Sequence, residues 1–300
     1  MIPWMKNFIW GTPPPPSPPS PPETLEEEWR PVDWSNEEKQ RLLRELKEFQ
    51  LSTSMVSQVR ILLCGPVGSG KSSFINSVNT VLQGRNTTDA LADSIGGVSF
   101  TVKFKTYKLK KDRAGSFFPF VFNDTMGMEA EISHGIQTND LISILQGHVQ
   151  EGYTFNPLTE LTDEKREYDQ TPSLDGKVHC LVSILPADKI SMMPQSVICE
   201  MRKVREKARD LEIPQVVIMT RVDLICKLVS KDLKMIYRSK KIKDKIEECS
   251  NRLGVTKNYI FPVKMYSEEI TTNSNVDILI LMAMTNIVNF ANDFVEREYQ

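Results

Sequence analysis

The residues with the clearest chemical meaning form a glycine-rich run in the first third of the chain. Residues 65–72 read Gly-Pro-Val-Gly-Ser-Gly-Lys-Ser, which fits the pattern G-x-x-x-x-G-K-[ST]. In such a loop the backbone N–H groups cradle phosphates, the lysine places its charge beside the β- and γ-phosphates, and the hydroxyl binds Mg²⁺. We therefore predict a phosphate site formed by Gly65, Pro66, Val67, Gly68, Ser69, Gly70, Lys71, Ser72 and Ser73. A buried strand before the run and a helix after it disfavour the alternative, a glycine-rich turn with a surface lysine.

A second motif supplies the other half of a magnesium site. Residues 124–127 read Asp-Thr-Met-Gly and fit D-x-x-G directly after an expected strand. In this pattern Asp124 would hold Mg²⁺ through water, and the N–H of Gly127 would contact the γ-phosphate. Ser72 and Asp124 are therefore the predicted metal-binding residues.

A third motif favours guanine over adenine. Residues 220–223 read Thr-Arg-Val-Asp and resemble [NT]-K-x-D. The carboxylate of Asp223 would accept two hydrogen bonds from the guanine edge, a pair that adenine does not donate. Thr220 and Arg221 complete the motif, and the long side chain of Arg221 can cover the base in place of the usual lysine. GTP and GDP are thus the expected ligands.

Two further features bear on the nucleotide. Val263 and Lys264 follow the last expected strand, where guanine-binding proteins place a backbone N–H against the base carbonyl. Met128 directly follows D-x-x-G, where Ras-like enzymes carry a glutamine that orients the attacking water. We expect slow hydrolysis, or hydrolysis that depends on a group supplied from elsewhere. Three candidates for the residue that senses the γ-phosphate remain open, namely Thr87, Thr88 and Ser94.

Alternating elements place these motifs at strand ends. Strands are expected at residues 59–64, 98–109, 118–123, 178–185, 214–219 and 259–263, and helices at 71–82, 139–149, 196–211, 230–253 and 276–295. This alternation is typical of an α/β protein with a mostly parallel sheet and helices on both faces. With the P-loop, it predicts a P-loop NTPase fold with a Ras-like G domain and six strands.

The chain divides into three predicted parts. Residues 1–32 hold ten of the 18 prolines, eight of them between Thr12 and Pro22, and are expected to be a disordered tail, either a spacer or a docking segment for a proline-recognising domain. Residues 33–54 contain a helix at 36–50 that starts with a capping box at Ser35 and should pack on the G domain. Residues 55–300 form the G domain itself.

Composition and charge exclude several classes of protein. The chain is 40% apolar and 25% charged, as in globular proteins, and its formal charge of −2 offers no general attraction to nucleic acid. The longest uncharged apolar run, residues 278–292, is too short and too polar to span a bilayer, so we expect a buried helix and no transmembrane segment. Five cysteines without a CxxC pair, and no signal peptide, indicate reduced thiols and a cytoplasmic protein.

Some segments keep two interpretations. Residues 227–245 carry eight basic and two acidic side chains, which suits a solvated helix face, an acidic partner or a membrane surface. Residues 152–176 are polar and form a long insertion between a helix and a strand. The three histidines show no metal-ligand spacing.

Four stretches together resemble a known family. Residues 60–74, 118–128, the tract Tyr-Thr-Phe-Asn-Pro at 153–157 and Pro-Val-Lys-Met-Tyr at 262–266 look like the interferon-induced protein 44 and 44-like family, from about Trp29 onward. The resemblance implies an intracellular, interferon-induced protein of the innate immune response that binds GTP. In the family's positions, residues 65–72 would hold phosphate and residues 124–127 would form the switch. Longer members carry an N-terminal TLDc-like domain, where this chain has its proline-rich tail.

Three functions are consistent with these observations. The first is a guanine-nucleotide-binding protein of the antiviral response, which acts through unidentified protein partners by way of the tail or the switch loops. The second is an active P-loop NTPase that uses ATP or GTP. The third is an immune scaffold that binds no nucleotide, which an intact Lys71 and Ser72 disfavour.

Overall fold

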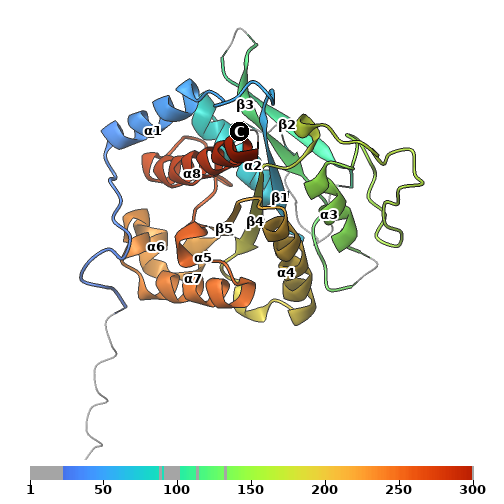
Figure 1. The fold of residues 1–300 in the computed structure, drawn as a ribbon. Coiled ribbons are helices and arrows are strands. Elements are labelled where there is room, and N and C mark those ends of the chain that lie inside the picture. Colours follow the sequence, from blue (N-terminus) through green and yellow to red (C-terminus); the bar gives the residue numbers. More distant parts are fainter. Residues whose placement is uncertain (1–22, 88–89, 91–101, 113–114, 132–133, 299–300) are drawn as a thin grey trace, which may run out of the picture.

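The computed structural model describes residues 23–87, 90, 102–112, 115–131 and 134–298. Its centre is a six-stranded sheet in the order β2-β3-β1-β4-β5-β6 (Figure 1). The strands are β1 (Val59–Cys64), β2 (Lys105–Lys110), β3 (Phe117–Asp124), β4 (Cys180–Pro186), β5 (Gln215–Thr220) and β6 (Ile260–Pro262). All neighbouring strands pair in parallel except β2, which runs antiparallel to β3. The predicted α/β fold with a mostly parallel sheet of six strands is confirmed.

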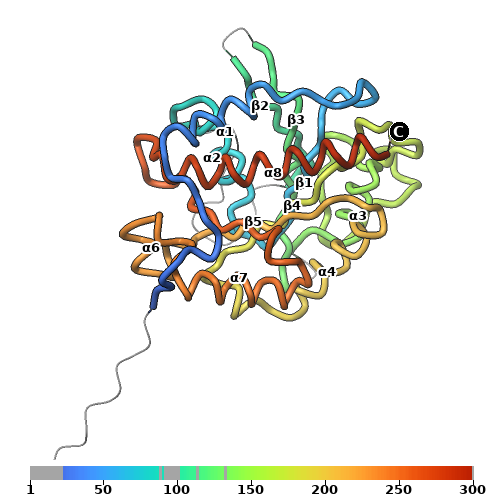
Figure 2. The backbone as a smooth tube through the Cα atoms, turned by 60° about the vertical axis from the view of Figure 1, so that its left-hand side comes forward, coloured from blue at the N-terminus to red at the C-terminus, as the bar shows by residue number. Residues whose placement is uncertain are grey.

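Helices cover both faces of the sheet (Figures 1 and 2). On one face lie α2 (Lys71–Gln83) and α8 (Ser274–Glu298), with α1 (Asn36–Glu48) packed on the outside of α8. On the other face lie α3 (Thr138–Gln146) and α4 (Gln195–Asp210), and α7 (Lys240–Leu253) packs beside β6 and α4. The short helices are α5 (Val222–Ile225), α6 (Lys227–Lys231), η1 (Leu174–Gly176), η2 (Ile190–Met192), η3 (Leu233–Tyr237) and η4 (Lys257–Tyr259).

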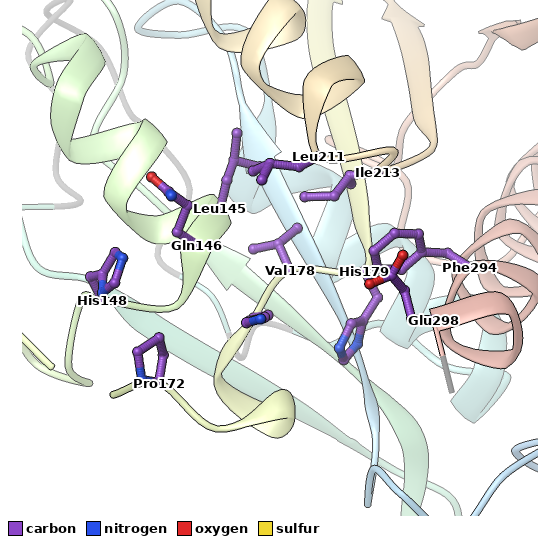
Figure 3. Close-up of a pocket in the computed structure, with 11 residues that line it drawn as sticks. Leu145, Gln146, His148, Pro172, Val178, His179, Leu211, Ile213, Phe294 and Glu298 are labelled. Carbon is purple, nitrogen blue, oxygen red and sulfur yellow. The ribbon is translucent and has the colours of Figure 1, made fainter. Parts of the chain in front are cut away.

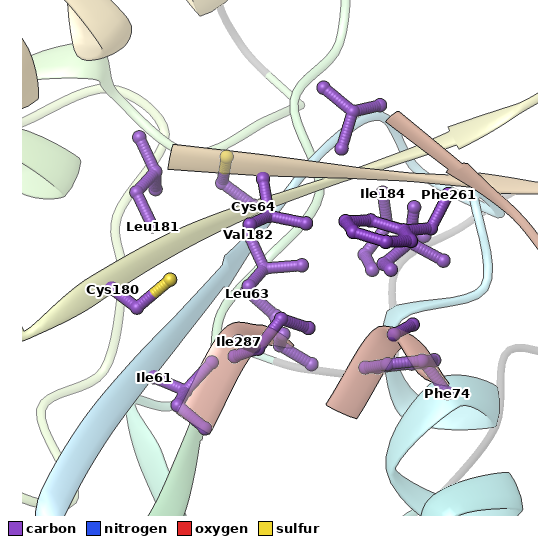
Figure 4. Packing of buried hydrophobic residues seen from close by; sticks show 14 of the residues in the cluster. Ile61, Leu63, Cys64, Phe74, Cys180, Leu181, Val182, Ile184, Phe261 and Ile287 are labelled. Atoms are coloured by element: carbon purple, nitrogen blue, oxygen red, sulfur yellow. The ribbon is translucent and has the colours of Figure 1, made fainter. Parts of the chain in front are cut away.

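The central strands are buried on both sides. Every residue of β4 is buried, and β1 is buried apart from Arg60. Central parallel strands meet helices on each face, and this explains why their sequences are continuous apolar runs and do not alternate. Figure 4 shows Ile61 and Leu63 of β1 with Phe74 of α2 and Ile287 of α8 in this core.

The cysteines follow the expected pattern of reduced thiols. All five are unpaired, and four of them are buried; the exception is Cys199 on α4. Burial raises the pKa of the Cys249 thiol to about 12, which keeps it protonated and unreactive near neutral pH.

Helix α8 is a core helix of this domain. Among the described residues it alone is long and apolar enough to cross a membrane, with a mean hydropathy of 1.5 over its most apolar window. However, 67% of that window is buried, against β1, β4 and α1. Its apolar character is therefore accounted for by packing.

Two expected elements differ from the prediction. The long helix at 230–253 is divided, because the Asp232 side chain accepts from the N–H of Lys234 and the Ser239 hydroxyl accepts from the N–H of Ile242, so a new helix starts at each. The strand expected at 98–109 begins at Lys105, and residues 98–101 lie outside the described residues. Before it, the N–H of Phe104 donates to Tyr153 O (2.8 Å), so residues 102–104 pair with the insertion.

The folded unit starts earlier than the predicted tail boundary. The N–H of Leu25 donates to Arg238 O (2.8 Å), and the guanidinium of Arg30 donates to Ile260 O (3.0 Å). That guanidinium also lies over the rings of Trp29 and Tyr237, at 5.2 and 5.5 Å from their centroids. Residues 23–32 thus lie against the domain and do not belong to a free tail, while residues 1–22 are outside the described residues.

A buried histidine lies at the start of β4, at the end of the sheet opposite the P-loop. His179 precedes β4 and lines a cavity of about 220 Å³ together with Phe294 and Leu145 (Figure 3). Its Nδ1 accepts the N–H of Arg60 (2.9 Å), so Nε2 carries the proton and faces Leu174 O (3.2 Å). Burial lowers the pKa of His179 to about 4 from 6.5, and the imidazole is held neutral.

This pKa makes the fold sensitive to acid. Because the folded pKa lies below the unfolded value, the contribution of His179 is complete above pH 6.5 and is lost as the pH falls towards about 4. Between about pH 7.5 and pH 5 the wild-type free energy of unfolding should fall by roughly 2 kcal/mol on this account. Urea unfolding of wild type and His179→Asn at both pH values measures it, and equal losses in the two proteins would contradict the assignment.

Candidate functional site

The predicted phosphate loop joins β1 to α2 and touches β4. A Cβ on Gly65 would lie 2.3 Å from the carbonyl oxygen of Ile184, so only glycine fits at the start of the loop. Gly68 and Gly70 have φ values of +68° and +101°, which other residues rarely adopt. The glycines of the motif are thus required by close approach and by backbone conformation.

Lys71 folds back over this loop. Its ammonium group donates to Gly65 O (3.3 Å) and Pro66 O (3.2 Å), and the residue is only 4% exposed. A cation held among carbonyls at the start of a helix favours a bound anion, since the helix N-terminus adds positive potential.

The two predicted metal-binding side chains are in direct contact. The Ser72 hydroxyl donates to Asp124 Oδ2 (2.8 Å), and both residues are buried. Asp124 Oδ1 accepts the N–H of Thr125 (3.0 Å), which orients the carboxylate. Hydroxyl and carboxylate oxygens suit Mg²⁺, which typically takes one or two protein ligands and completes its shell with phosphate and water. In the described part of the chain, no group of three or more His, Cys, Asp and Glu side chains could hold a metal ion.

The D-x-x-G turn lies directly on the P-loop. The N–H of Met128 donates to Gly65 O (3.0 Å), and the N–H of Val67 donates to Met128 O (3.1 Å). A Cβ on Gly127 would lie 2.4 Å from Val67 Cγ2 and 2.6 Å from its Cα. The glycine of the second motif is therefore required by contact with the first.

The position after D-x-x-G carries no group that can orient water. Met128 is 3% exposed and lines a mainly apolar groove of about 290 Å³ with Pro66, Val67 and Met193. Glu129 and Lys189 are the charged residues that line this groove.

The guanine-type motif also reaches the P-loop. The Thr220 hydroxyl donates to Ser69 O (3.0 Å), and Arg221 Nη2 donates to Gly68 O (2.7 Å). The guanidinium is therefore engaged at the P-loop, which leaves only the stem of Arg221 to face a base. Asp223, in α5, is partly buried and lines a groove of about 800 Å³ with Leu224.

The strand-end prediction needs one correction. The N–H of Val263 donates to Met219 O (2.8 Å) within the sheet and is not available to a base carbonyl. Lys264 follows, and its ammonium pairs with Glu269 (2.6 Å). Sequence reasoning missed Met265, whose Sδ lies 3.3 Å from where a Cβ of Gly70 would be, because an apolar residue in a loop carries no chemical signal.

The other predicted site residues have simpler positions. Ser73 is partly buried in the first turn of α2. Thr87 donates its hydroxyl to Asn76 O (3.2 Å) near the end of α2. Thr88 and Ser94, the two other candidates for the γ-phosphate sensor, are outside the described residues.

Together these contacts define a class of protein. A glycine-rich loop after a central buried strand is joined by hydrogen bonds to D-x-x-G and T-R-x-D turns at the carboxyl ends of β3 and β5. This is the arrangement of a P-loop protein with G-domain topology.

Comparison with known proteins shows which proteins the chain is similar to. The chain is 32% identical to interferon-induced protein 44 of Homo sapiens over 255 residues, which cover 85% of this chain and 57% of that protein. It is 30% identical to human interferon-induced protein 44-like (87% and 58% covered) and 30% identical to the protein 44 of Mus musculus (85% and 60% covered). The chain is thus similar to interferon-induced protein 44 and 44-like proteins, and it spans about three fifths of the length of these relatives. No family model matches the sequence.

Solved structures with a similar fold share little sequence. Toc33 from Arabidopsis thaliana, in complex with GDP and Mg²⁺, is 11% identical with a TM-score of 0.46, over 86% of this chain and 91% of that chain. A probable GTP-binding protein engB is 10% identical with a TM-score of 0.42, over 78% and 99%.

The contact between the two turns can be tested at Gly127. Gly127→Ala places a methyl group against the backbone of Val67 and should lower the free energy of unfolding by about 2–3 kcal/mol. Gly152→Ala is the matched control, since its Cβ meets open space and only its φ of +84° adds strain, about 1 kcal/mol. Chemical denaturation compares the two. Equal losses would show that Gly127 is not pressed against the P-loop.

Proposed function

We propose that this chain binds GDP and GTP with Mg²⁺ at the P-loop edge of the sheet. The observation that carries the proposal is the pair of contacts from Thr220 and Arg221 to the P-loop at Ser69 and Gly68. An unrelated polar turn after β5 has no reason to contact a phosphate loop through its first two side chains. A turn that reads the base must be held at a fixed distance from the loop that holds the phosphates.

Each predicted residue then has a separate role. The N–H groups at the end of the loop, from Gly70 into the first turn of α2, would bind the phosphates, since those of Val67 and Ser69 donate within the protein (3.1 and 3.2 Å). Lys71 would neutralise the phosphate charge. Ser72 and Asp124, already hydrogen-bonded to each other, hold Mg²⁺ directly and through water. Asp223 would accept hydrogen bonds from guanine, and the backbone N–H of Lys264 would donate to the base carbonyl.

The biological setting follows from the relatives. Because these are interferon-induced proteins by name, we propose an interferon-induced protein of the innate immune and antiviral response, located in the cytoplasm. It would act through protein partners that bind the switch loops or the proline-rich residues 1–22.

If Asp223 reads guanine, a substitution at this residue should change which nucleotide the protein prefers. Isothermal titration calorimetry should show that GDP and GTP bind and that ATP binds at least about tenfold more weakly. The Asp223→Asn variant should bind GDP about tenfold or more weakly than wild type, and it should gain affinity for xanthosine diphosphate. The amide donates where the carboxylate accepted, and xanthine presents a carbonyl in place of the amine.

The controls separate the three functions. Lys71→Ala should lower the affinity for every nucleotide by about tenfold or more without a change of base preference, because it removes a phosphate contact. ATP affinity equal to that of GTP would support a general P-loop NTPase. If wild type shows no binding and no thermal stabilisation, where a ligand at about 100 times Kd should add 2.7 kcal/mol, the protein is a scaffold.

We further propose that hydrolysis is slow in the isolated chain. With Met128 in an apolar groove, a single-turnover assay with excess protein should give a rate at or below about 10⁻⁴ s⁻¹, the order of Ras without a partner. Met128→Gln should raise the rate by restoring an amide that orients water, and Met128→Leu should leave it unchanged. Rapid hydrolysis by wild type would contradict the proposal.

A further inference from the structure

We propose that Asp188 and Arg221 form a clamp that positions the P-loop for nucleotide, and that Asp188 is a positioning residue for this site. The inference rests on the proposed function and assigns a role to a residue outside every motif. It explains why an arginine stands where [NT]-K-x-D carries lysine.

The clamp joins three segments through one side chain. Arg221 Nη2 donates to Gly68 O (2.7 Å), while its other terminal nitrogen, Nη1, lies 3.6 Å from Asp188 Oδ2. Asp188 follows β4 and Arg221 follows β5, and the N–H of Ala187 donates to Thr220 O (2.9 Å). That backbone bond holds the two strand ends in register, so the acid and the base face each other. The residue Arg221 itself has a φ of +57°, an uncommon conformation that turns the chain sharply after β5.

An arginine can serve both partners, but a lysine cannot do so as well. The guanidinium is a rigid fork with separate N–H groups, whereas an ammonium is a single point of charge. One nitrogen of Arg221 can therefore hold the carbonyl while the other faces the carboxylate. A lysine at this position would bind either Gly68 O or the Asp188 carboxylate, and a carboxylate attracts an ammonium group more strongly than a carbonyl does.

Asp188 depends on this arginine. Its Oδ1 is buried and accepts no hydrogen bond from the described residues, and Arg221 is the cation that the structure pairs with its other oxygen. Without the guanidinium charge the carboxylate would be left with a buried, uncompensated oxygen. The arginine at position 221, in place of the motif's lysine, and the aspartate at position 188 therefore act together.

The clamp fixes the orientation of peptide planes in the P-loop. In a planar trans peptide the C=O and the following N–H point in opposite directions, so fixing one fixes the other. Arg221 holds Gly68 O and Thr220 holds Ser69 O, which are two successive peptide planes of the P-loop. The N–H in the plane held by Arg221 is that of Ser69, and it donates to Pro66 O (3.2 Å), which closes the turn of the loop. The N–H in the plane held by Thr220 is that of Gly70, and it is directed away from T-R-x-D. The turn after β5 therefore sets the conformation of the loop that would receive the phosphates.

A double-mutant cycle on the full chain tests the clamp, with GDP and Mg²⁺ as the probe in calorimetry. Arg221→Lys should weaken GDP binding about tenfold or more, since the ammonium moves to Asp188 and releases Gly68 O. Asp188→Asn in wild type should weaken it about three- to fivefold, the range of a partly exposed ion pair. In the Arg221→Lys background, however, Asp188→Asn should strengthen binding at least threefold, because the lysine is freed to return to Gly68 O.

This reversal of sign is the decisive result. The clamp is wrong if Asp188→Asn changes the GDP affinity by the same factor in the wild-type and Arg221→Lys backgrounds, or if it leaves the affinity unchanged in both. In that case, GDP binding by wild type would still support the proposed function. If wild type binds no guanine nucleotide, the proposed function fails and the clamp fails with it. A purely structural ion pair would shift the thermal midpoint without any reversal in affinity.

A matched ion pair supplies the control. Asp210→Asn removes the partner of Arg209 (3.0 Å) at the end of α4 and should leave GDP affinity unchanged. Thermal midpoints of all variants without nucleotide identify any that fail to fold. Should Arg221→Lys be unfolded, Asp188→Ala must still weaken GDP binding about three- to fivefold in a protein with a wild-type midpoint, and unchanged affinity there overturns the clamp.

Discussion

The arrangement of this protein depends on the parallel pairing of β1 with β3 and β4. Parallel strands end at the same edge of a sheet, so the loops that follow them must meet there. The close approach of Gly65 to Ile184 O on β4 is a direct result, and so is the contact between Gly127 and Val67. Any side chain at either glycine would push two strand ends apart. The glycines of two separate motifs therefore report one constraint, which is the spacing of neighbouring strands.

The P-loop is also the point at which the other loops are joined. Its carbonyls accept hydrogen bonds from Lys71, Met128, Thr220 and Arg221, which come from α2 and from the turns after β3 and β5. A backbone that accepts so many bonds is held in one conformation before any ligand arrives, and preorganisation of this kind lowers the entropic cost of binding. The same arrangement leaves an apolar wall at Met128 beside the loop.

The two tracts at 153–157 and 262–266, which carry the resemblance to interferon-induced protein 44, have structural roles in this domain. Tyr153 and Phe155 are buried, and their backbones pair with residues 102–104 ahead of β2. Tyr266 donates its hydroxyl to Asp277 Oδ1 (2.5 Å) on α8, and its backbone N–H donates to Ser77 Oγ (3.0 Å) on α2, so this residue links the two helices. These residues hold the insertion and the last loop against the domain.

The sequence by itself determined the fold class, the strands β1 and β3 to within a residue, and the glycine-rich and D-x-x-G turns that follow these strands, because these depend on local periodicity and on short motifs. Other features required the tertiary structure. The break of the helix at 230–253, the packing of residues 23–32 and the engagement of the Val263 N–H depend on partners far away in the chain. The same is true of the link between Asp188 and Arg221, which are 33 positions apart and meet only because β4 and β5 end side by side. Long-range pairing of polar groups leaves no periodic trace in a sequence, and only the folded backbone decides it.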